Sequence, residues 1–206
     1  MTKIKICGLT RMEDIRAVNH LRPDFVGFVF AKSRRRITDG KARELRQALD
    51  MEIPAVGVFV DGPIEHIEQL CRENVIQMAQ LHGDEDGAYI RRLRVKIPGI
   101  PIIKAVRVKT TEQIYDAEQM DCNYLLLDAF AKDTYGGSGR VFDWSLIPTL
   151  SKPYFLAGGL NADTVREAIA FCAPYAVDVS SAVETAGVKD EEKIKKLIER
   201  VRKYEQ

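Results

Sequence analysis

Residues Lys3–Thr10 read KIKICGLT, and this stretch decides how the rest of the chain is interpreted. It has the pattern of a short β-strand that ends at a glycine, with a thiol as its last side chain before the turn. Because successive side chains of a strand point to opposite faces, the two lysines share a face with Cys7 and the two isoleucines share the other. Charged and thiol groups on one strand face suggest a function, since alternating α/β proteins bind ligands at the carboxyl ends of their strands.

Length and composition are those of an ordinary globular protein. The chain has 206 residues, 46% of them hydrophobic and 30% charged, which fits one domain over residues 1–206. A net charge of +1 provides no field for nucleic acid, and no apolar run approaches the ~20 residues of a membrane span. The four widely spaced cysteines match neither a metal site nor a disulfide framework, and the N-terminus does not resemble a signal peptide. We therefore expect a cytoplasmic protein with no nucleic-acid or membrane partner and no metal.

Strand-type and helix-type segments alternate along the whole chain. Eight apolar segments predict strands: Lys3–Cys7, Asp24–Phe30, Pro54–Val60, Ile76–Leu81, Pro101–Arg107, Asn123–Asp128, Tyr154–Ala157 and Ala176–Val179. The helix-type segments between and after them are Met12–Leu21, Asp39–Asp50, Ile64–Asn74, Asp86–Lys96, Thr111–Met120, a brief turn near Asp143–Leu150, Ala162–Cys172 and a charged helix from about Asp190. Such repeats indicate parallel strands covered on both faces.

Two α/β architectures fit this alternation, an open doubly wound sheet and a closed (β/α)8 TIM barrel. The number of strand segments favours eight parallel strands in a barrel, as does the lack of a GxGxxG pattern after the first strand. The chain is short for a barrel, so its connections must be tight.

The carboxyl ends of the eight strands would meet at one mouth of such a barrel. The residues there are Cys7, Phe30, Val60, Leu81 with His82, Arg107, Asp128, Ala157 with Gly158 and Gly159, and Ser180 with Ser181. Loops after the seventh and eighth strands often bind phosphate, and glycine N–H groups and serine hydroxyls suit an anion. Gly158, Gly159, Ser180 and Ser181 therefore predict a phosphate site, with a plain tight turn as the alternative for the glycine pair.

Asp128 and Cys7 are the candidate acid and base. Asp128 follows an apolar strand, where desolvation would raise the pKa of its carboxyl and let it hold a proton, although it could instead cap a turn. Cys7 alone could be a buried, inert thiol, but across a barrel mouth from Asp128 it would complete an acid–base pair. As a base, the thiol needs nearby positive charge to favour the thiolate.

Two loops carry further candidates. The segment Lys32–Arg36 (KSRRR) is either a solvated loop or the source of an arginine that binds a substrate carboxylate. The glycine-rich segment Asp133–Arg140 follows the Asp128 strand and is either a mobile lid or a plain surface loop.

Together these stretches closely resemble the phosphoribosylanthranilate isomerase family of tryptophan biosynthesis. The matching motifs run in order along the chain: KICGLT ending at Thr10, VGFVF at Val26–Phe30, S-x-R at Ser33–Arg35, GVFVD at Gly57–Asp61, QLHG at Gln80–Gly83, LLLD at Leu125–Asp128, GGSG at Gly136–Gly139, FDW at Phe142–Trp144, GGLN at Gly158–Asn161 and VDVSS at Val177–Ser181. The resemblance covers the full length.

The resemblance implies a (β/α)8 barrel that performs an Amadori rearrangement of a small phosphosugar without a cofactor. It makes Cys7 the general base at the sugar C2, Asp128 the general acid at the furanose ring oxygen, and Arg35 the partner of the anthranilate carboxylate. The neighbours of Arg35 in the run of three arginines leave that register open. The glycine and serine pairs would hold the phosphate, and His82, Asp178 and Lys5 are further candidates for substrate contact or support.

One position departs from the family pattern, because Ala182 stands where a glycine usually follows the two serines. If that position required positive φ, alanine would strain the loop by about 1 kcal/mol, so we expect an adjusted loop and retained activity. We also expect Lys5 to pair with Asp178, since the first and last strands adjoin in a closed barrel and an unpaired buried charge is unfavourable.

Two rival functions stay open, the analogous sugar isomerase of the histidine pathway and a phosphate-ligand binding protein that has lost the chemistry. The histidine-pathway enzyme has aspartate where this chain has Cys7, and retention of both Cys7 and Asp128 speaks against a mere binding protein. A monomer and a homodimer both fit the sequence.

Overall fold

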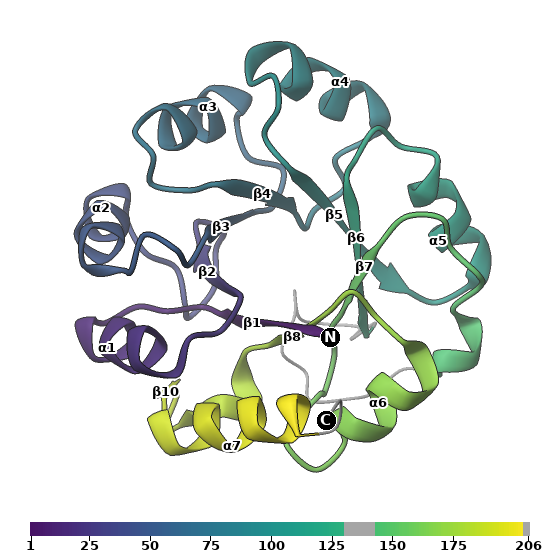
Figure 1. Cartoon of the computed structure of the whole chain (residues 1–206). Coiled ribbons are helices and arrows are strands. Elements are labelled where there is room, and N and C mark those ends of the chain that lie inside the picture. The colour runs from purple at the N-terminus through teal and green to yellow at the C-terminus, as the bar shows by residue number, and fades with distance from the viewer. Residues whose placement is uncertain (130–142, 204–206) are drawn as a thin grey trace.

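The structure, a computed structural model, describes residues 1–129 and 143–203 of the chain. Eight parallel strands form a closed barrel in sequence order. This confirms the predicted barrel and excludes the alternative, an open doubly wound sheet. The strands are β1 (Lys3–Cys7), β2 (Phe25–Val29), β3 (Ala55–Phe59), β4 (Met78–Leu81), β5 (Ile102–Val108), β6 (Tyr124–Ala129), β7 (Tyr154–Leu156) and β8 (Ala176–Val179). Figure 1 looks along the barrel, with the helices arranged as a ring around the strands.

The helices follow the predicted segments closely, with two differences. They are α1 (Met12–Leu21), α2 (Asp39–Ala48), α3 (Ile64–Arg72), α4 (Gly87–Lys96), α5 (Thr111–Glu118), α6 (Val165–Cys172) and α7 (Glu191–Arg202). Side chains of Thr38, Asp86 and Asp190 accept hydrogen bonds from the first turns of α2, α4 and α7, as N-cap residues do.

The two differences both lie near the seventh strand. Helix α6 begins at Val165 and not at Ala162, because the Asn161 side chain accepts hydrogen bonds from the Asp163 and Thr164 amides and holds a turn there. The segment expected to be helical near Asp143–Leu150 contains only a 3-10 turn, η1 (Trp144–Leu146).

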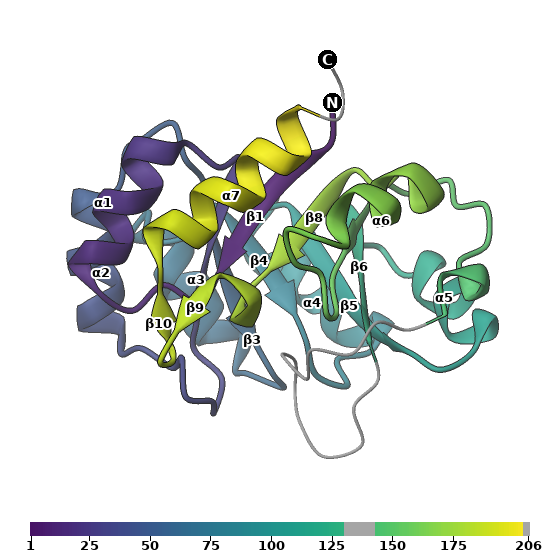
Figure 2. The ribbon, with the colours of Figure 1, turned by 90° about the horizontal axis from the view of Figure 1, so that it is seen from below.

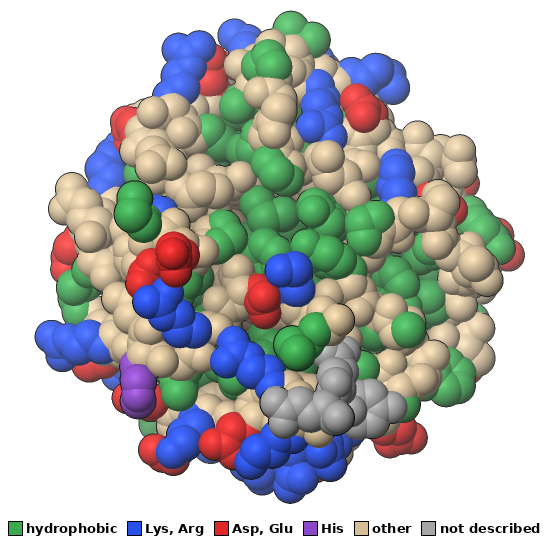
Figure 3. All heavy atoms as spheres, viewed as in Figure 1, with side chains coloured by type: hydrophobic (Ala, Val, Ile, Leu, Met, Phe, Trp, Pro, Cys, Tyr) green, Lys and Arg blue, Asp and Glu red, His purple; other side chains and the backbone are tan. Residues whose placement is uncertain are grey.

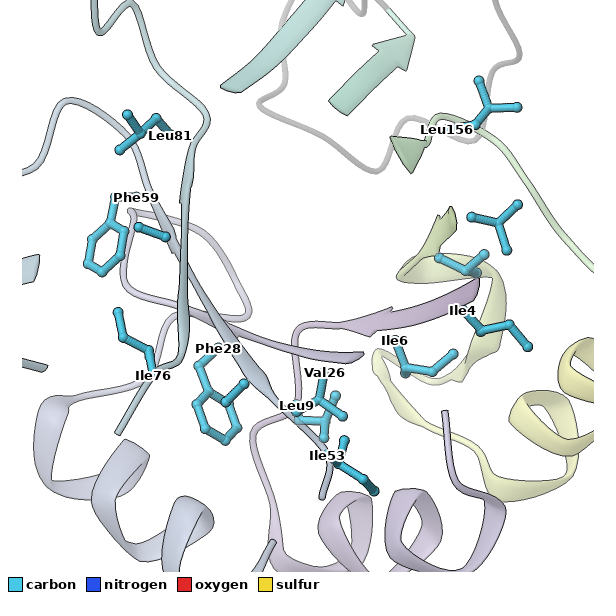
Figure 4. Packing of buried hydrophobic residues seen from close by; sticks show 14 of the residues in the cluster. Ile4, Ile6, Leu9, Val26, Phe28, Ile53, Phe59, Ile76, Leu81 and Leu156 are labelled. Carbon is cyan, nitrogen blue, oxygen red and sulfur yellow. The ribbon is translucent and has the colours of Figure 1, made fainter. Parts of the chain in front are cut away.

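Strand alternation produces two apolar layers. Residues such as Ile4, Ile6 and Phe28 face outward and join the large cluster between the barrel and its helices, which Figure 4 shows from close by. A smaller cluster, built around Phe25 and Phe155, fills the barrel interior. Since both strand faces are buried, the strands contain long apolar runs.

A short hairpin follows β8 and packs against the last helix. The 3-10 turn η2 (Ser181–Val183) leads into β9 (Glu184–Thr185), which pairs with β10 (Val188–Lys189). Ala186 and Gly187 between them both have positive φ, the conformation of a tight hairpin turn.

The strands run from the side of the N-terminus to the opposite end of the barrel. Figure 2 shows β1 running from the N-terminus at the top towards the lower side, where β9 and β10 also lie. On the face that Figure 3 presents, hydrophobic side chains gather near the centre beside oppositely charged ones, and further charged side chains lie towards the rim.

Candidate active site

A cavity of about 260 Å³ opens at the carboxyl ends of the strands. Its walls bring together most of the predicted site residues, which are Cys7, Arg35, His82, Asp128, Gly158, Gly159, Asp178, Ser180 and Ser181. These residues come from β1, from β8, from the strand ends between them and from the loop before α2. The barrel therefore assembles in one place groups that are far apart in the sequence, such as Cys7 and Ser180, which are separated by 173 positions.

Cys7 is the last residue of β1 and is 8% exposed. Its thiol fits because position 27 on the neighbouring strand is glycine: a Cβ there would lie 2.6 Å from the Cys7 sulfur. The two residues are paired in the β1–β2 register. Gly27 in the middle of an apolar strand thus makes room for the thiol at the cavity wall.

Lys5 lies one inward position below Cys7 and is fully buried. Its ammonium nitrogen is 2.9 Å from the Asp178 carboxylate, and the two residues are directly paired between β1 and β8, so the predicted ion pair is confirmed. Burial acts to lower the pKa of Lys5, but Asp178 and the Cys7 thiol together raise it above its ordinary value. Lys5 is therefore a buried cation close enough to Cys7 for each residue to shift the pKa of the other.

Burial and neighbouring charges shift the pKa of the Cys7 thiol in opposing directions. Burial raises its pKa and is the largest effect, the Lys5 ammonium lowers it, Asp178 raises it, and Lys189 lowers it. The net direction is upward. The two lysines are the positive charges that a base at this position requires, but they do not cancel the effect of burial.

Asp128 is 5% exposed and lies at the opposite side of the cavity. Its strand neighbours Leu126 and Tyr124 belong to or pack against the interior cluster, as alternation predicted. Among the described residues, His82 approaches it, with Nε2 3.5 Å from the Asp128 carboxylate. This separation lacks hydrogen-bond geometry, and His82 Nε2 has no hydrogen-bond partner among the described residues.

Gln80 is a site residue that the sequence analysis missed. It is 1% exposed, lines the cavity, and its side-chain amide lies 2.7 Å from His82 Nδ1. A polar side chain on the inward face of β4 is unusual, and the alternation within the QLHG motif could have revealed it.

The loop after β7 has the backbone that an anion site needs. Gly158 and Gly159 have φ of +82° and +69°, a region that disfavours side chains. A Cβ on Gly158 would lie 2.5 Å from the Ala129 nitrogen and 3.0 Å from an Asp128 carboxylate oxygen. The glycine pair is therefore required by conformation and by contact with the strand that carries Asp128.

The loop after β8 differs from the expectation in two details. The Ser180 hydroxyl donates to the Cys7 carbonyl oxygen over 2.9 Å, so its hydrogen is already engaged and an anion would meet its backbone N–H. Ala182 lies within η2 and is not among the residues with positive φ, so alanine is accommodated there without the strain considered above.

The arginines of the run before α2 differ in their position relative to the cavity. Arg35 lines the cavity and its side chain is 13% exposed, whereas the Arg34 side chain is 58% exposed and is not a wall residue. Arg35 donates from Nε and Nη2 to the two carboxylate oxygens of Glu184, over 2.6 and 3.1 Å. Glu184 and its partner Lys189 are further residues that the sequence analysis did not single out.

Three predicted strand-end residues, Phe30, Leu81 and Arg107, lie outside this cavity wall. Phe30 stacks on Phe59 with ring centroids 5.2 Å apart, and Arg107 pairs with the Asp84 carboxylate at 3.0 Å. The predicted lid, Asp133–Arg140, and the GGSG motif within it lie outside the described residues. Over the described part of the chain, no cluster of three or more potential metal ligands is found, and no helix could span a membrane.

The fold and this cavity define a (β/α)8-barrel protein in which a thiol, a carboxyl group, an arginine and two loops that contain glycine or serine pairs meet at the carboxyl ends of the strands. Comparison with known proteins identifies the family. The model of the N-(5'-phosphoribosyl)anthranilate isomerase family matches residues 4–200, and the chain belongs to that family.

Relatives support this assignment over the whole length. The N-(5'-phosphoribosyl)anthranilate isomerase of Endomicrobium trichonymphae is 48% identical over 202 residues, covering 98% of both chains. The crystal structure of phosphoribosyl anthranilate isomerase from Thermus thermophilus superposes with a TM-score of 0.85 at 33% identity, covering 98% of this chain and 99% of that one. Another similar structure holds the isomerase with reduced 1-(o-carboxyphenylamino)-1-deoxyribulose 5-phosphate, with a TM-score of 0.81, 34% identity and coverage of 98% and 100%.

Proposed function

We propose that this chain isomerises N-(5'-phosphoribosyl)anthranilate to 1-(2-carboxyphenylamino)-1-deoxyribulose 5-phosphate in tryptophan biosynthesis. One observation carries the proposal: Cys7, Asp128, Arg35 and the two anion-binding loops all line one cavity. Family membership and the related structure with a reduced product analogue support the same reaction.

Asp128 acts first, as the general acid. It donates a proton to the furanose ring oxygen, the C1–O bond breaks, and the anthranilate nitrogen supplies electrons to form a Schiff base. The burial of Asp128 beside the apolar end of β6 removes competing water from this step. Positioned acid or base groups typically contribute 10²–10⁴-fold to such proton transfers.

Cys7 then acts as the general base. Its thiolate removes the proton from C2 of the open-chain sugar, the electron pair forms the C1–C2 double bond of an enolamine, and the enol tautomerises to the ketone as C1 gains a proton. Lys5 and Lys189 favour the thiolate, and the hydrogen bond from Ser180 fixes the backbone that carries it. Overall the reaction only moves protons within one substrate.

Binding groups hold the substrate at its two charged ends. The N–H groups of Gly158, Gly159, Ser180 and Ser181 receive the phosphate, and Arg35 receives the anthranilate carboxylate. His82, with Gln80 fixing its ring, borders Asp128 and supports it. Fixing both ends places the sugar between Cys7 and Asp128, which is how positioning lowers a barrier.

Four free cysteines support a reducing, cytoplasmic location.

The test is turnover of phosphoribosylanthranilate, followed by chromatography of substrate and aminoketose product. We expect the unmutated protein to turn over, and Cys7→Ala and Asp128→Asn each to lower kcat at least 10²-fold while circular dichroism spectra stay unchanged. Glu52→Gln is the control, because Glu52 is an exposed carboxylate remote from the cavity.

The rival functions predict other results. Tight binding of the product with no turnover by the unmutated protein would show a binding protein. Preferential turnover of the histidine-pathway aminoaldose would show the other isomerase.

A further inference from the structure

Positively charged side chains surround the Glu184 carboxylate beside the cavity. Besides Arg35, it accepts from Arg34 Nη2 over 2.6 Å and from Lys189 Nζ over 2.7 Å. Its side chain is only 4% exposed, and so is almost completely shielded from water. Three cations that donate to one buried carboxylate are held more strongly than the partners of an exposed surface ion pair.

The geometry at Arg35 leaves part of its guanidinium available. Glu184 binds the side-on edge, formed by Nε and one N–H of Nη2. A guanidinium has five N–H groups, so the outer edge, which includes Nη1, can donate to a second carboxylate. The side chain lines the cavity, where a substrate carboxylate would arrive.

The stem of Arg35 is also constrained. A Cβ on Gly8 would lie 2.4 Å from Arg35 Cδ, so the arginine lies against a backbone position that only glycine leaves open. Gly8 has φ +84°, which glycine adopts readily. Arg35 is thus held between the turn after β1 and the carboxylate on β9.

Glu184 is in turn connected to the catalytic end of the barrel. It stands directly opposite Lys189 in the β9–β10 hairpin, and Lys189 Nζ also donates to the Ser180 carbonyl oxygen over 3.0 Å. Ser180 donates to the Cys7 carbonyl oxygen. One series of contacts therefore joins Arg35, the hairpin, the loop after β8 and β1.

We propose that Glu184 is a positioning residue that holds the Arg35 guanidinium with its outer edge towards the substrate carboxylate, and so sets selectivity for carboxylate-bearing substrates. This inference rests on the proposed function. Glu184 acts through Arg35 and does not touch the substrate. With its three partners it forms a cluster of net charge +2 beside the cavity, which attracts an anionic substrate.

The experiment compares two substrates, phosphoribosylanthranilate and N-(5-phosphoribosyl)aniline, which lacks the carboxylate. For each protein, kcat and KM are measured by chromatography, and the ratio of the two kcat/KM values gives the carboxylate selectivity. For Glu184→Gln we expect a KM for phosphoribosylanthranilate about tenfold higher, kcat within about threefold, and selectivity about tenfold lower. The aniline substrate should keep its kcat/KM within about twofold.

A double-mutant cycle tests whether Glu184 acts through Arg35. In an Arg35→Gln background, adding Glu184→Gln should change selectivity by less than about twofold, because the guanidinium is already absent. Glu52→Gln is the matched control: it removes an exposed glutamate that pairs with Arg22 away from the cavity, and should leave both substrates unchanged.

Glu184→Asp keeps the buried charge and decides the question if Glu184→Gln fails to fold. Its shorter side chain cannot hold both Arg35 donors, so selectivity should fall at least threefold. Equal losses for both substrates would overturn the inference, since they indicate a structural role alone. A lower KM for phosphoribosylanthranilate would also overturn it, because Glu184 would then compete with the substrate. If the unmutated protein turns over neither substrate, the proposed function itself fails.

Discussion

Replacing Gly158 with alanine should lower both stability and activity. The structure shows two separate causes of the lower stability, a backbone conformation that disfavours a side chain and a lack of space for a Cβ. Position 158 has φ +82°, where a side chain adds roughly 1–2 kcal/mol of strain. The new Cβ would also lie 2.5 Å from the Ala129 nitrogen and 2.7 Å from the Ala129 Cβ. Overpacking of this kind typically adds about 1–3 kcal/mol. We therefore expect Gly158→Ala to lower the free energy of unfolding by about 2–5 kcal/mol.

Gly99→Ala is the matched control. Gly99 has φ +87°, almost the same as Gly158, but a Cβ there would meet no atom within 4 Å. It precedes β5, at the end of the barrel away from the cavity. Only the strain should apply, about 1–2 kcal/mol, so the two variants should differ by the overpacking of about 1–3 kcal/mol.

The assays are urea denaturation and turnover of phosphoribosylanthranilate. The Cβ at position 158 pushes on the residue after Asp128 and lies 3.0 Å from the Asp128 carboxylate, so the acid should shift. A displacement near 1 Å can lower catalysis about 10²-fold, and we expect a loss of that order for Gly158→Ala and less than twofold for Gly99→Ala. Equal destabilisation by the two variants, with activity retained in both, would refute the reasoning.

Three further predictions use the same assays. Lys5→Met should lower the free energy of unfolding by about 3–5 kcal/mol, because it leaves Asp178 buried without its cation; a loss below 1 kcal/mol would contradict the ion pair. Gly40→Ala, at an exposed position in the first turn of α2 with open space for a Cβ, should stabilise by about 0.4–1 kcal/mol without changing kcat, and urea denaturation that shows a loss would count against it. Because the pKa of Cys7 is raised, kcat/KM should increase from pH 7 to pH 9 as the thiolate forms; a flat profile would argue against Cys7 as the base.

Local patterns predicted the barrel well because each βα unit is specified by its own residues. Alternation placed Lys5 and Cys7 on the inward face of β1, and closure of the barrel then required the pairing with Asp178. The boundaries failed where side chains compete with the helix, as at Asn161, whose carboxamide holds a turn and delays α6.

The network around Arg35 could not be predicted in the same way. Glu184 is 149 residues from Arg35, and nothing in its own neighbourhood shows which cation it will meet. The turn at Gly187 sets Glu184 opposite Lys189, a pairing that the sequence analysis did not predict. The position of the β9–β10 hairpin beside Arg35 was the part that could not be predicted, because it depends on how η2 and α7 pack.

The charges around Cys7 bear on its proposed role as the base, because they act on a buried thiol whose pKa is raised. Asp178 raises the pKa of Cys7, yet it also keeps Lys5 charged in a place where burial would otherwise favour the neutral amine. Removing Asp178 would therefore weaken the cation that helps the thiolate form. A raised pKa reduces the fraction of Cys7 that is thiolate, but it makes each thiolate a stronger base. The greater basicity offsets part of the rate lost through the smaller thiolate fraction. The Lys5–Asp178 ion pair thus stabilises the barrel interior and also influences the basicity of the Cys7 thiolate, which would have to take a proton from carbon.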